Sequence, residues 1–287
     1  RAIDYGRLTI EKLEKINTPL SKGNVLRIIT TLRIPYRSSD KLPEGVQFIT
    51  EKLREYKSSN DSSGIRICHW ILGGFYNTIG LNESAIYHMK KSISYNDTSE
   101  SRKQLPGFNF EGKIFTLNNT GVLIPIYLKM GLYDKAIEYG NKLLREAFYY
   151  YSPAGGGDST KGGVNALNNI THLAHAKILA NQLDSVDYLL RISESIRFDG
   201  AYKSFTLQIR SLYDMKRGAF KEADSLLRKC WQLVNQYQIN ENSGAGTVQP
   251  DYYLALLRIE QKKYNEAIAF LLKDVIRVKP LREYVLQ

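Results

Sequence analysis

The chain has 287 residues, 43% of them hydrophobic and 24% charged, a balance that supports a buried core and excludes a fibrous or low-complexity chain. Its two cysteines are far too few for a disulfide-stapled scaffold. Forty basic against 29 acidic residues give a formal charge of +11, but no basic run exceeds two adjacent residues. We therefore interpret the excess as a solvated helix surface and expect no specific nucleic-acid binding. No apolar run reaches the length of a membrane span, so no membrane segment is expected within this chain.

Residues 1–64 carry helix signals without a clean repeat. Apolar residues at helical spacing from Val25 to Leu32 predict a helix that Pro35 would end. Pro43 opens another at its first turn, with an apolar stripe from Val46 to Tyr56. We interpret this region as irregular hairpins that cap an array formed by residues 65–287.

From residue 65 a helical-hairpin pattern recurs. Its clearest copy is Leu72-Gly73-x-x-Tyr76, followed by a turn at Gly80 and a second helix containing Ala85. The spacing places Gly73 and Ala85 on the two helices of one hairpin, where small side chains allow the backbones to approach closely.

Four further copies follow in the same order. The corresponding residues are Leu123, Tyr127, Gly131, Tyr133 and Ala136 in the second copy, Leu173 and Ala174 in the third, Gly218, Phe220 and Ala223 in the fourth, and Tyr264 and Ala267 in the fifth. The third copy has Val186 at the small position, and Arg210 occupies the apolar leucine position of the fourth. In each copy, an aromatic or leucine at the turn is expected to cap the helix crossing.

These residues resemble the tetratricopeptide repeat. The resemblance implies an all-α, right-handed α-solenoid in which residues 65–287 form five hairpins with insertions. Such arrays are usually recognition modules for proteins or extended peptides, with a groove lined by the first helices. The resemblance therefore implies a protein or peptide partner, no catalysis and no cofactor.

Four segments interrupt the helical pattern: 57–64, 97–112, 149–163 and 240–246. They are predicted to be connections rich in serine, asparagine or glycine. The glycines from Gly155 to Gly163 invite a phosphate-loop interpretation, but Lys161 is followed by Gly162 instead of Ser or Thr, and a helix precedes them. We therefore interpret this glycine-rich stretch as either a flexible connection or a loop that contacts a partner.

The chain offers weak candidates for chemistry. His172 and His175 lie three apart on a predicted helix, but no Cys, Asp or Glu lies one turn away to complete a metal site. Cys68-His69 lacks a nearby acidic residue for a nucleophile pair. We therefore predict no catalytic, cofactor-binding or metal-binding residue.

Twenty tyrosines suit either half-buried helix seams or a surface that binds peptide or sugar. The main hypothesis is a protein- or peptide-binding array. The alternative is a small-ligand or glycan-binding protein of a bacterial envelope, with Trp70 or Trp231 as stacking platforms. A nucleic acid or another anionic partner is third.

The irregular hairpins and the tyrosine- and asparagine-rich texture are also similar to the helical-repeat sensor regions of bacterial membrane-bound regulators. That second resemblance implies a role in signal transduction, with a membrane span and an output domain downstream. It favours the bacterial periplasm or cell envelope over the cytoplasm.

Overall fold

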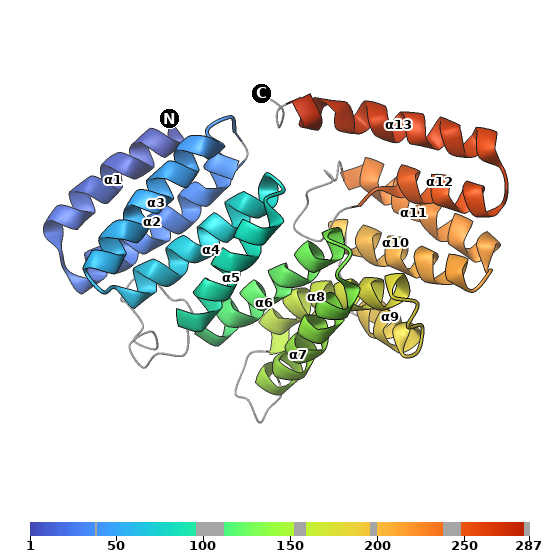
Figure 1. Ribbon diagram of the computed structural model, residues 1–287, viewed down its shortest axis with the longest axis horizontal. Coiled ribbons are helices and arrows are strands. Elements are labelled where there is room, and N and C mark those ends of the chain that lie inside the picture. Colours follow the sequence, from blue (N-terminus) through green and yellow to red (C-terminus); the bar gives the residue numbers. More distant parts are fainter. Residues whose placement is uncertain (38, 96–111, 152–158, 196–199, 238–247, 284–287) are drawn as a thin grey trace. The chain divides into compact units, whose positions relative to one another are not determined.

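The computed structural model describes residues 1–37, 39–95, 112–151, 159–195, 200–237 and 248–283. Within these ranges the chain forms thirteen α-helices and no strand, which confirms the predicted all-α fold (Figure 1). The helices are α1 (Ala2–Ile16), α2 (Pro19–Arg37), α3 (Leu42–Ser58), α4 (Ser62–Thr78), α5 (Asn82–Ser94), α6 (Gly112–Lys129), α7 (Tyr133–Tyr151), α8 (Ser159–Leu179), α9 (Val186–Ser195), α10 (Ala201–Lys216), α11 (Phe220–Tyr237), α12 (Pro250–Glu260) and α13 (Tyr264–Glu283).

The chain divides into two compact units, residues 1–126 and 127–287, and the border lies inside α6. Successive helices in each unit pack as hairpins: α1 with α2 and α4 with α5 in unit 1, then α8 with α9, α10 with α11 and α12 with α13 in unit 2. In unit 2, α7 also packs against α8, the first helix of the following hairpin. The expected cap, residues 1–64, is wholly within unit 1, where α2 and α3 also contact α4.

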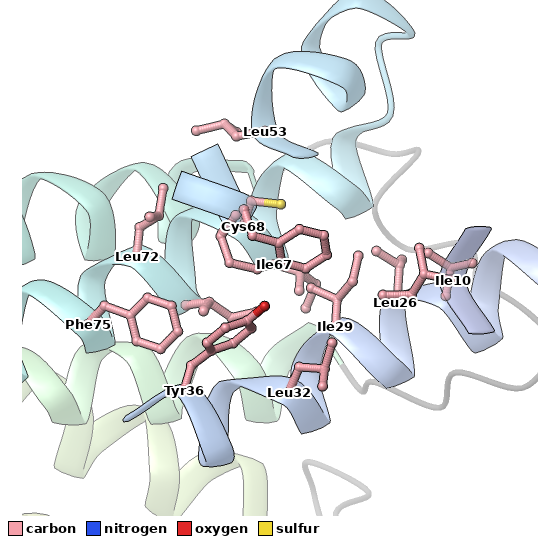
Figure 2. Close-up of a cluster of buried hydrophobic side chains, with 14 of the residues drawn as sticks. Ile10, Leu26, Ile29, Leu32, Tyr36, Leu53, Ile67, Cys68, Leu72 and Phe75 are labelled. Atoms are coloured by element: carbon pink, nitrogen blue, oxygen red, sulfur yellow. The ribbon is translucent and has the colours of Figure 1, made fainter. Parts of the chain in front are cut away.

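The core of unit 1 is formed by apolar side chains from α1 to α4 (Figure 2). Tyr36 and Phe75 are fully buried, with ring centroids 6.4 Å apart. Arg7 donates from Nε to the Tyr36 hydroxyl at 2.7 Å, so the buried phenol keeps a polar partner. Cys68 belongs to this core, and Cys230 is equally buried in unit 2, as expected for inert thiols.

Two expectations for the N-terminal region are wrong. Pro35 lies inside α2, which continues to Arg37. A proline in the last turn removes only one backbone donor, and the buried Tyr36 anchors that turn in the core. The predicted connection 57–64 shrinks to residues 59–61, because Asp61 caps α4 by accepting from the Gly64 backbone N–H at 2.9 Å.

The predicted turn glycines adopt left-handed backbone. The five hairpin turns place such a residue five positions before the small position: Gly80 (φ 78°), Gly131 (φ 71°), Asn181 (φ 56°), Gly218 (φ 76°) and Lys262 (φ 59°). In every one, its N–H bonds to the carbonyl three residues back, and the next N–H bonds to the carbonyl five residues back. This is the Schellman pattern of helix C-termini. The turns thus share one geometry although only three have glycine.

The remaining predicted interruptions differ in outcome. Residues 97–111 and 240–246 are outside the described ranges, as are residues 152–158 of the glycine-rich stretch. Residues 149–151 end α7 and residues 159–163 begin α8, so that part of the predicted connection is helical. Burial of Ile170, Leu173 and Ala174 stabilises α8 enough to tolerate Gly162 and Gly163 near its start.

Candidate functional site

The predicted repeat residues form the scaffold. The side chains of Leu72, Leu123, Tyr127, Leu173 and Ala174 are at most 4% exposed, and the four predicted alanines of the second helices at most 2%. A Cβ on Gly73 would lie 2.9 Å from Cε of Met89 on α5, so α4 and α5 are in close contact there. Tyr264 is 59% exposed, however, so the expectation that it caps a helix crossing is wrong.

The first helices of unit 2 bring together four side chains that we call the imidazole–aromatic cluster: His172 and His175 on α8, Phe205 on α10 and Tyr253 on α12. The ring centroid of Phe205 lies 4.8 Å from that of His172 and 6.5 Å from that of His175. The Tyr253 hydroxyl lies 3.5 Å from Nε2 of His175, at the outer limit of a hydrogen bond. Three helices that are distant in sequence thus contribute to one cluster.

Both imidazoles of the cluster are neutral at pH 7. Burial lowers the pKa of His172 to about 3 and that of His175 to about 4, because removal from water disfavours the charged ring. Burial likewise raises the pKa of Tyr253. Nδ1 of His172 is buried and has no hydrogen-bond partner among the residues that the structure describes. The cluster therefore offers neutral donors and acceptors between aromatic faces.

The accessible edge of the cluster consists of His175, which is half-buried, and the neighbouring Tyr252, which is 39% exposed. The ring of Tyr252 meets that of Tyr253 edge-on at 5.4 Å. Side-chain amide Oε1 of Gln208 on α10 accepts from the backbone N–H of Gln249 at 2.7 Å, which fixes the start of α12. The edge is thus held on well-anchored helices.

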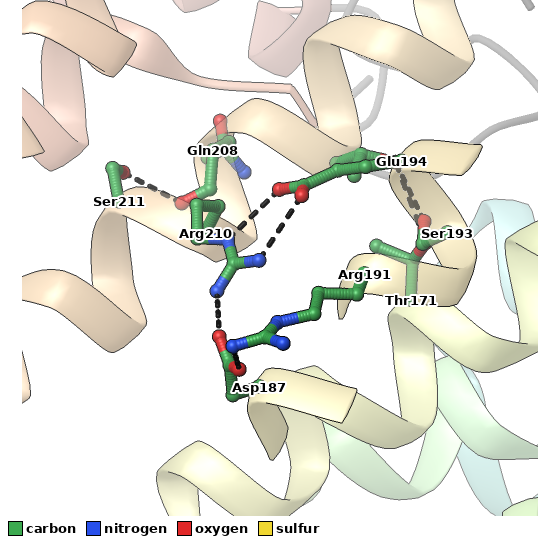
Figure 3. Close-up of polar contacts among 9 residues, drawn as sticks. Thr171, Asp187, Arg191, Ser193, Glu194, Gln208, Arg210 and Ser211 are labelled. Atoms are coloured by element: carbon green, nitrogen blue, oxygen red, sulfur yellow. Dashed lines mark hydrogen bonds and ion pairs between the residues drawn. The ribbon is translucent and has the colours of Figure 1, made fainter. Parts of the chain in front are cut away.

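Two arginine networks hold the helix pairs that carry the cluster. Arg210 on α10 donates from Nη1 to Asp187 on α9 at 2.6 Å and from Nε to Glu194 on α9 at 2.8 Å (Figure 3). In the same way Arg258 on α12 bonds to Asp224 on α11. Asp187 and Asp224 each directly follow the small position of their second helix. The arginine that replaces the expected leucine at position 210 therefore pairs with the preceding hairpin.

A buried hydroxyl network reinforces the junction of α8, α9 and α10. The hydroxyls of Thr171 and Ser193 lie 2.8 Å apart (Figure 3). Those of Ser193 and Thr206 lie 3.1 Å apart. All three side chains are at most 5% exposed, so their mutual bonds satisfy groups that water cannot reach.

Unit 1 contains a second histidine contact. Nδ1 of His69 on α4 lies 2.9 Å from Nδ1 of His88 on α5, and burial lowers the pKa of each ring to about 4. One neutral ring therefore donates to the other. Burial raises the pKa of the adjacent Cys68 thiol, which opposes thiolate formation.

The two tryptophans differ in how accessible their rings are. The guanidinium of Arg33 covers the ring of Trp70 at 4.5 Å, whereas Trp231 on α11 is 45% exposed.

The described residues contain no group of three or more His, Cys, Asp or Glu side chains able to hold a metal ion. Nor does any helix in the described ranges have the length and apolarity needed to cross a membrane. The paired basic residues Lys90-Lys91, Lys216-Arg217, Arg228-Lys229 and Lys262-Lys263 are exposed, each pair on a different helix or turn.

The described residues thus define an all-α protein built from successive helical hairpins. No family model and no curated protein matches the sequence. In fold, the chain is similar to the crystal structure of BtubC (BKLC) from P. vanneervenii, with a TM-score of 0.55 and 10% sequence identity. The match covers 84% of this chain and 92% of that one. At this identity the likeness shows the fold alone.

Proposed function

We propose that the protein is a recognition module that binds a protein or an extended peptide without catalysis, and that the edge formed by His175 and Tyr252 is part of its binding surface. The observation that carries this proposal is the imidazole–aromatic cluster on α8, α10 and α12. Neutral donors and acceptors beside aromatic faces suit the amide groups and apolar side chains of a peptide.

The scaffold supports the same proposal. A recognition surface must be held rigidly to limit the entropy lost on binding, and here the arginine and hydroxyl networks fix the helices beneath it. The resemblance of the five hairpins to tetratricopeptide repeats is in agreement with recognition. The finer proposal, that the module is the sensing or scaffolding part of a bacterial regulator, rests on sequence resemblance.

The test begins with a random linear-peptide library selected on the purified chain, followed by fluorescence anisotropy of individual peptides. We expect Tyr252→Ala and His175→Ala each to weaken binding at least about tenfold, as for residues near the centre of an interface. Tyr188→Ala is the matched control, because Tyr188 is 65% exposed on the second helix α9. Equal loss in the control, or no loss in either site variant, would contradict the proposal.

A glycan-binding function is the second candidate, favoured by the exposed ring of Trp231. Soluble oligosaccharides should then quench its fluorescence and lose affinity in Trp231→Ala. A nucleic-acid partner is third, and salt separates it from both. If the protein bound a nucleic acid through several phosphates, raising the salt concentration from about 50 to 200 mM would lower the affinity by roughly three orders of magnitude or more. Binding through aromatic contacts would change little over the same range.

A further inference from the structure

One partly buried arginine of unit 1 has no acidic partner among the described residues. The guanidinium of Arg33 on α2 lies 4.5 Å over the ring of Trp70 on α4. Its Nε is shielded from water and has no hydrogen-bond partner in the described part of the chain. Burial lowers the pKa of Arg33, and the neighbouring Arg37 lowers it further. A guanidinium nevertheless stays charged at pH 7, so Arg33 carries a positive charge that no described carboxylate compensates.

Arg37 adds a second positive charge on the same side of α2. It follows Arg33 by four residues, a spacing that places both side chains on one face of the helix, and it is exposed. Neither arginine forms an ion pair within the described ranges. The sequence of α2 contains four basic residues and no acidic one, so this helix supplies no counter-charge of its own. Like charges at this spacing repel each other, and an anion beside them would relieve the repulsion.

A third guanidinium comes from α4, which packs against α2. Arg66 precedes Trp70 by four residues and therefore lies on the same face of α4. Its side chain is 3% exposed, and burial lowers its pKa. Positive charge from two packed helices thus accumulates around Trp70, where removal from water strengthens its electrostatic field.

Other largely buried cations of the chain have the partners that Arg33 lacks. Lys52, Arg210 and Arg258 are each bound by two carboxylates. A charge removed from water without such a partner is costly. The exception at Arg33 therefore indicates a site whose counter-charge comes from a ligand.

We propose that Arg33 and Arg37, beside the ring of Trp70, bind a phosphate group, either free or in a small phosphate ester. Two guanidiniums match the charge of a phosphate monoester, which is about −1.5 to −2 at pH 7, whereas one carboxylate would leave a charge uncompensated. Trp70 restrains the guanidinium of Arg33, whose N–H groups suit two oxygens of one phosphate. This inference is independent of the peptide-binding proposal, since the imidazole–aromatic cluster lies in unit 2.

The fluorescence of Trp70 tests the site in a Trp231→Phe background, where the signal comes from unit 1 alone. Inorganic phosphate, exchanged for chloride at constant ionic strength, should give a saturable change with a Kd below about 1 mM. Arg33→Met should weaken binding at least about tenfold, and Arg37→Met at least about threefold, because each removes a charge-assisted contact. Arg27→Met is the matched control and should bind phosphate as the unmodified chain does, since Arg27 is an exposed arginine on another side of α2.

Stability without phosphate separates a ligand from a counter-charge within the chain. If the ligand supplies the counter-charge, Arg33→Met should be at least as stable to urea as the unmodified chain in phosphate-free buffer. Added phosphate should then raise the urea midpoint of the unmodified chain and leave that of Arg33→Met unchanged. A large loss of stability in Arg33→Met would overturn the proposal, because it would indicate a carboxylate already bound in the folded chain. The absence of saturable phosphate binding would overturn it as well.

Comparison of ligands identifies the chemical class and its source. Acetate that binds as tightly as phosphate would contradict the assignment to a phosphate group. Equal affinities for inorganic phosphate and O-phosphoserine would support a site for free phosphate. Binding of O-phosphoserine at least about tenfold tighter would support a phosphate ester as the ligand.

Discussion

Two adjacent glycines of α4 test whether the hairpin crossing is as tight as the structure indicates. A Cβ on Gly73 would lie 2.9 Å from Cε and 3.0 Å from Cγ of Met89, whose side chain is 1% exposed. Within the described part of the chain, a Cβ on Gly74 would have no neighbouring atom from another helix within 4 Å. The two positions share a helix and differ in what a methyl group would meet.

The expected magnitudes follow from that difference. Replacing glycine by alanine in a helix interior stabilises by about 0.5–1 kcal/mol. Gly74→Ala should therefore raise the free energy of unfolding by about that amount. At Gly73 the same gain is offset by overpacking, which costs about 1–3 kcal/mol. Gly73→Ala should be less stable than Gly74→Ala by about 1–3 kcal/mol.

The assay must report on unit 1 alone, since two compact units need not unfold together. Trp70 lies in unit 1 and Trp231 in unit 2, so Trp231→Phe leaves one tryptophan that follows the correct unit. Urea unfolding of both alanine variants in that background gives the comparison. Equal stabilisation by the two substitutions would refute the close approach of α4 and α5.

Three further predictions concern unit 2 and are measured by urea unfolding, followed by the fluorescence of its tryptophan, Trp231. Arg210→Met should destabilise by about 1–3 kcal/mol, because it removes the largely buried guanidinium that binds both Asp187 and Glu194. Arg191→Met removes only an exposed ion pair to Asp187 and should cost less than about 0.5 kcal/mol, so similar losses in the two variants would contradict the role of the network. The pKa of His172 is about 3 in the folded chain and near 6.5 when unfolded, so its stabilising contribution is present above about pH 6.5 and falls by about 2 kcal/mol on going to pH 5. His172→Phe should flatten that pH dependence, and an unchanged slope would count against burial of the neutral ring. Lys262→Gly should stabilise by up to about 1 kcal/mol, because glycine adopts the left-handed backbone without strain, and a destabilised variant would contradict the turn geometry.

Local signals in the sequence predicted the helices and turns well where one residue controls the backbone. Pro43 at the start of α3 and the left-handed glycines at 80, 131 and 218 are examples. The same reasoning is wrong for Pro35. The free-energy cost of a proline is small in the last turn of a helix, and here the buried Tyr36 anchors that turn in the core. The right-handed sense of the superhelix stays a prediction.

The candidate site was only partly predictable. The spacing of His172 and His175 indicates that they share one face of a helix, but Tyr253 contributes from 78 residues further along than His175. That contact depends on how α8, α10 and α12 pack, and helical periodicity holds no information about it. Arg210 departs from the repeat pattern in the sequence, but its partners on α9 can be identified only from the packed hairpins.

The two buried cysteines make each unit report on its own opening. Cys68 is in unit 1 and Cys230 in unit 2, and both side chains are inaccessible in the folded chain. A thiol reagent can therefore react with either only while the surrounding helices are transiently separated. Under native conditions, the labelling rate of each cysteine, resolved by peptide mass spectrometry, measures the opening free energy of its unit. The chain thus carries a natural probe of which half opens first when a partner binds or dissociates.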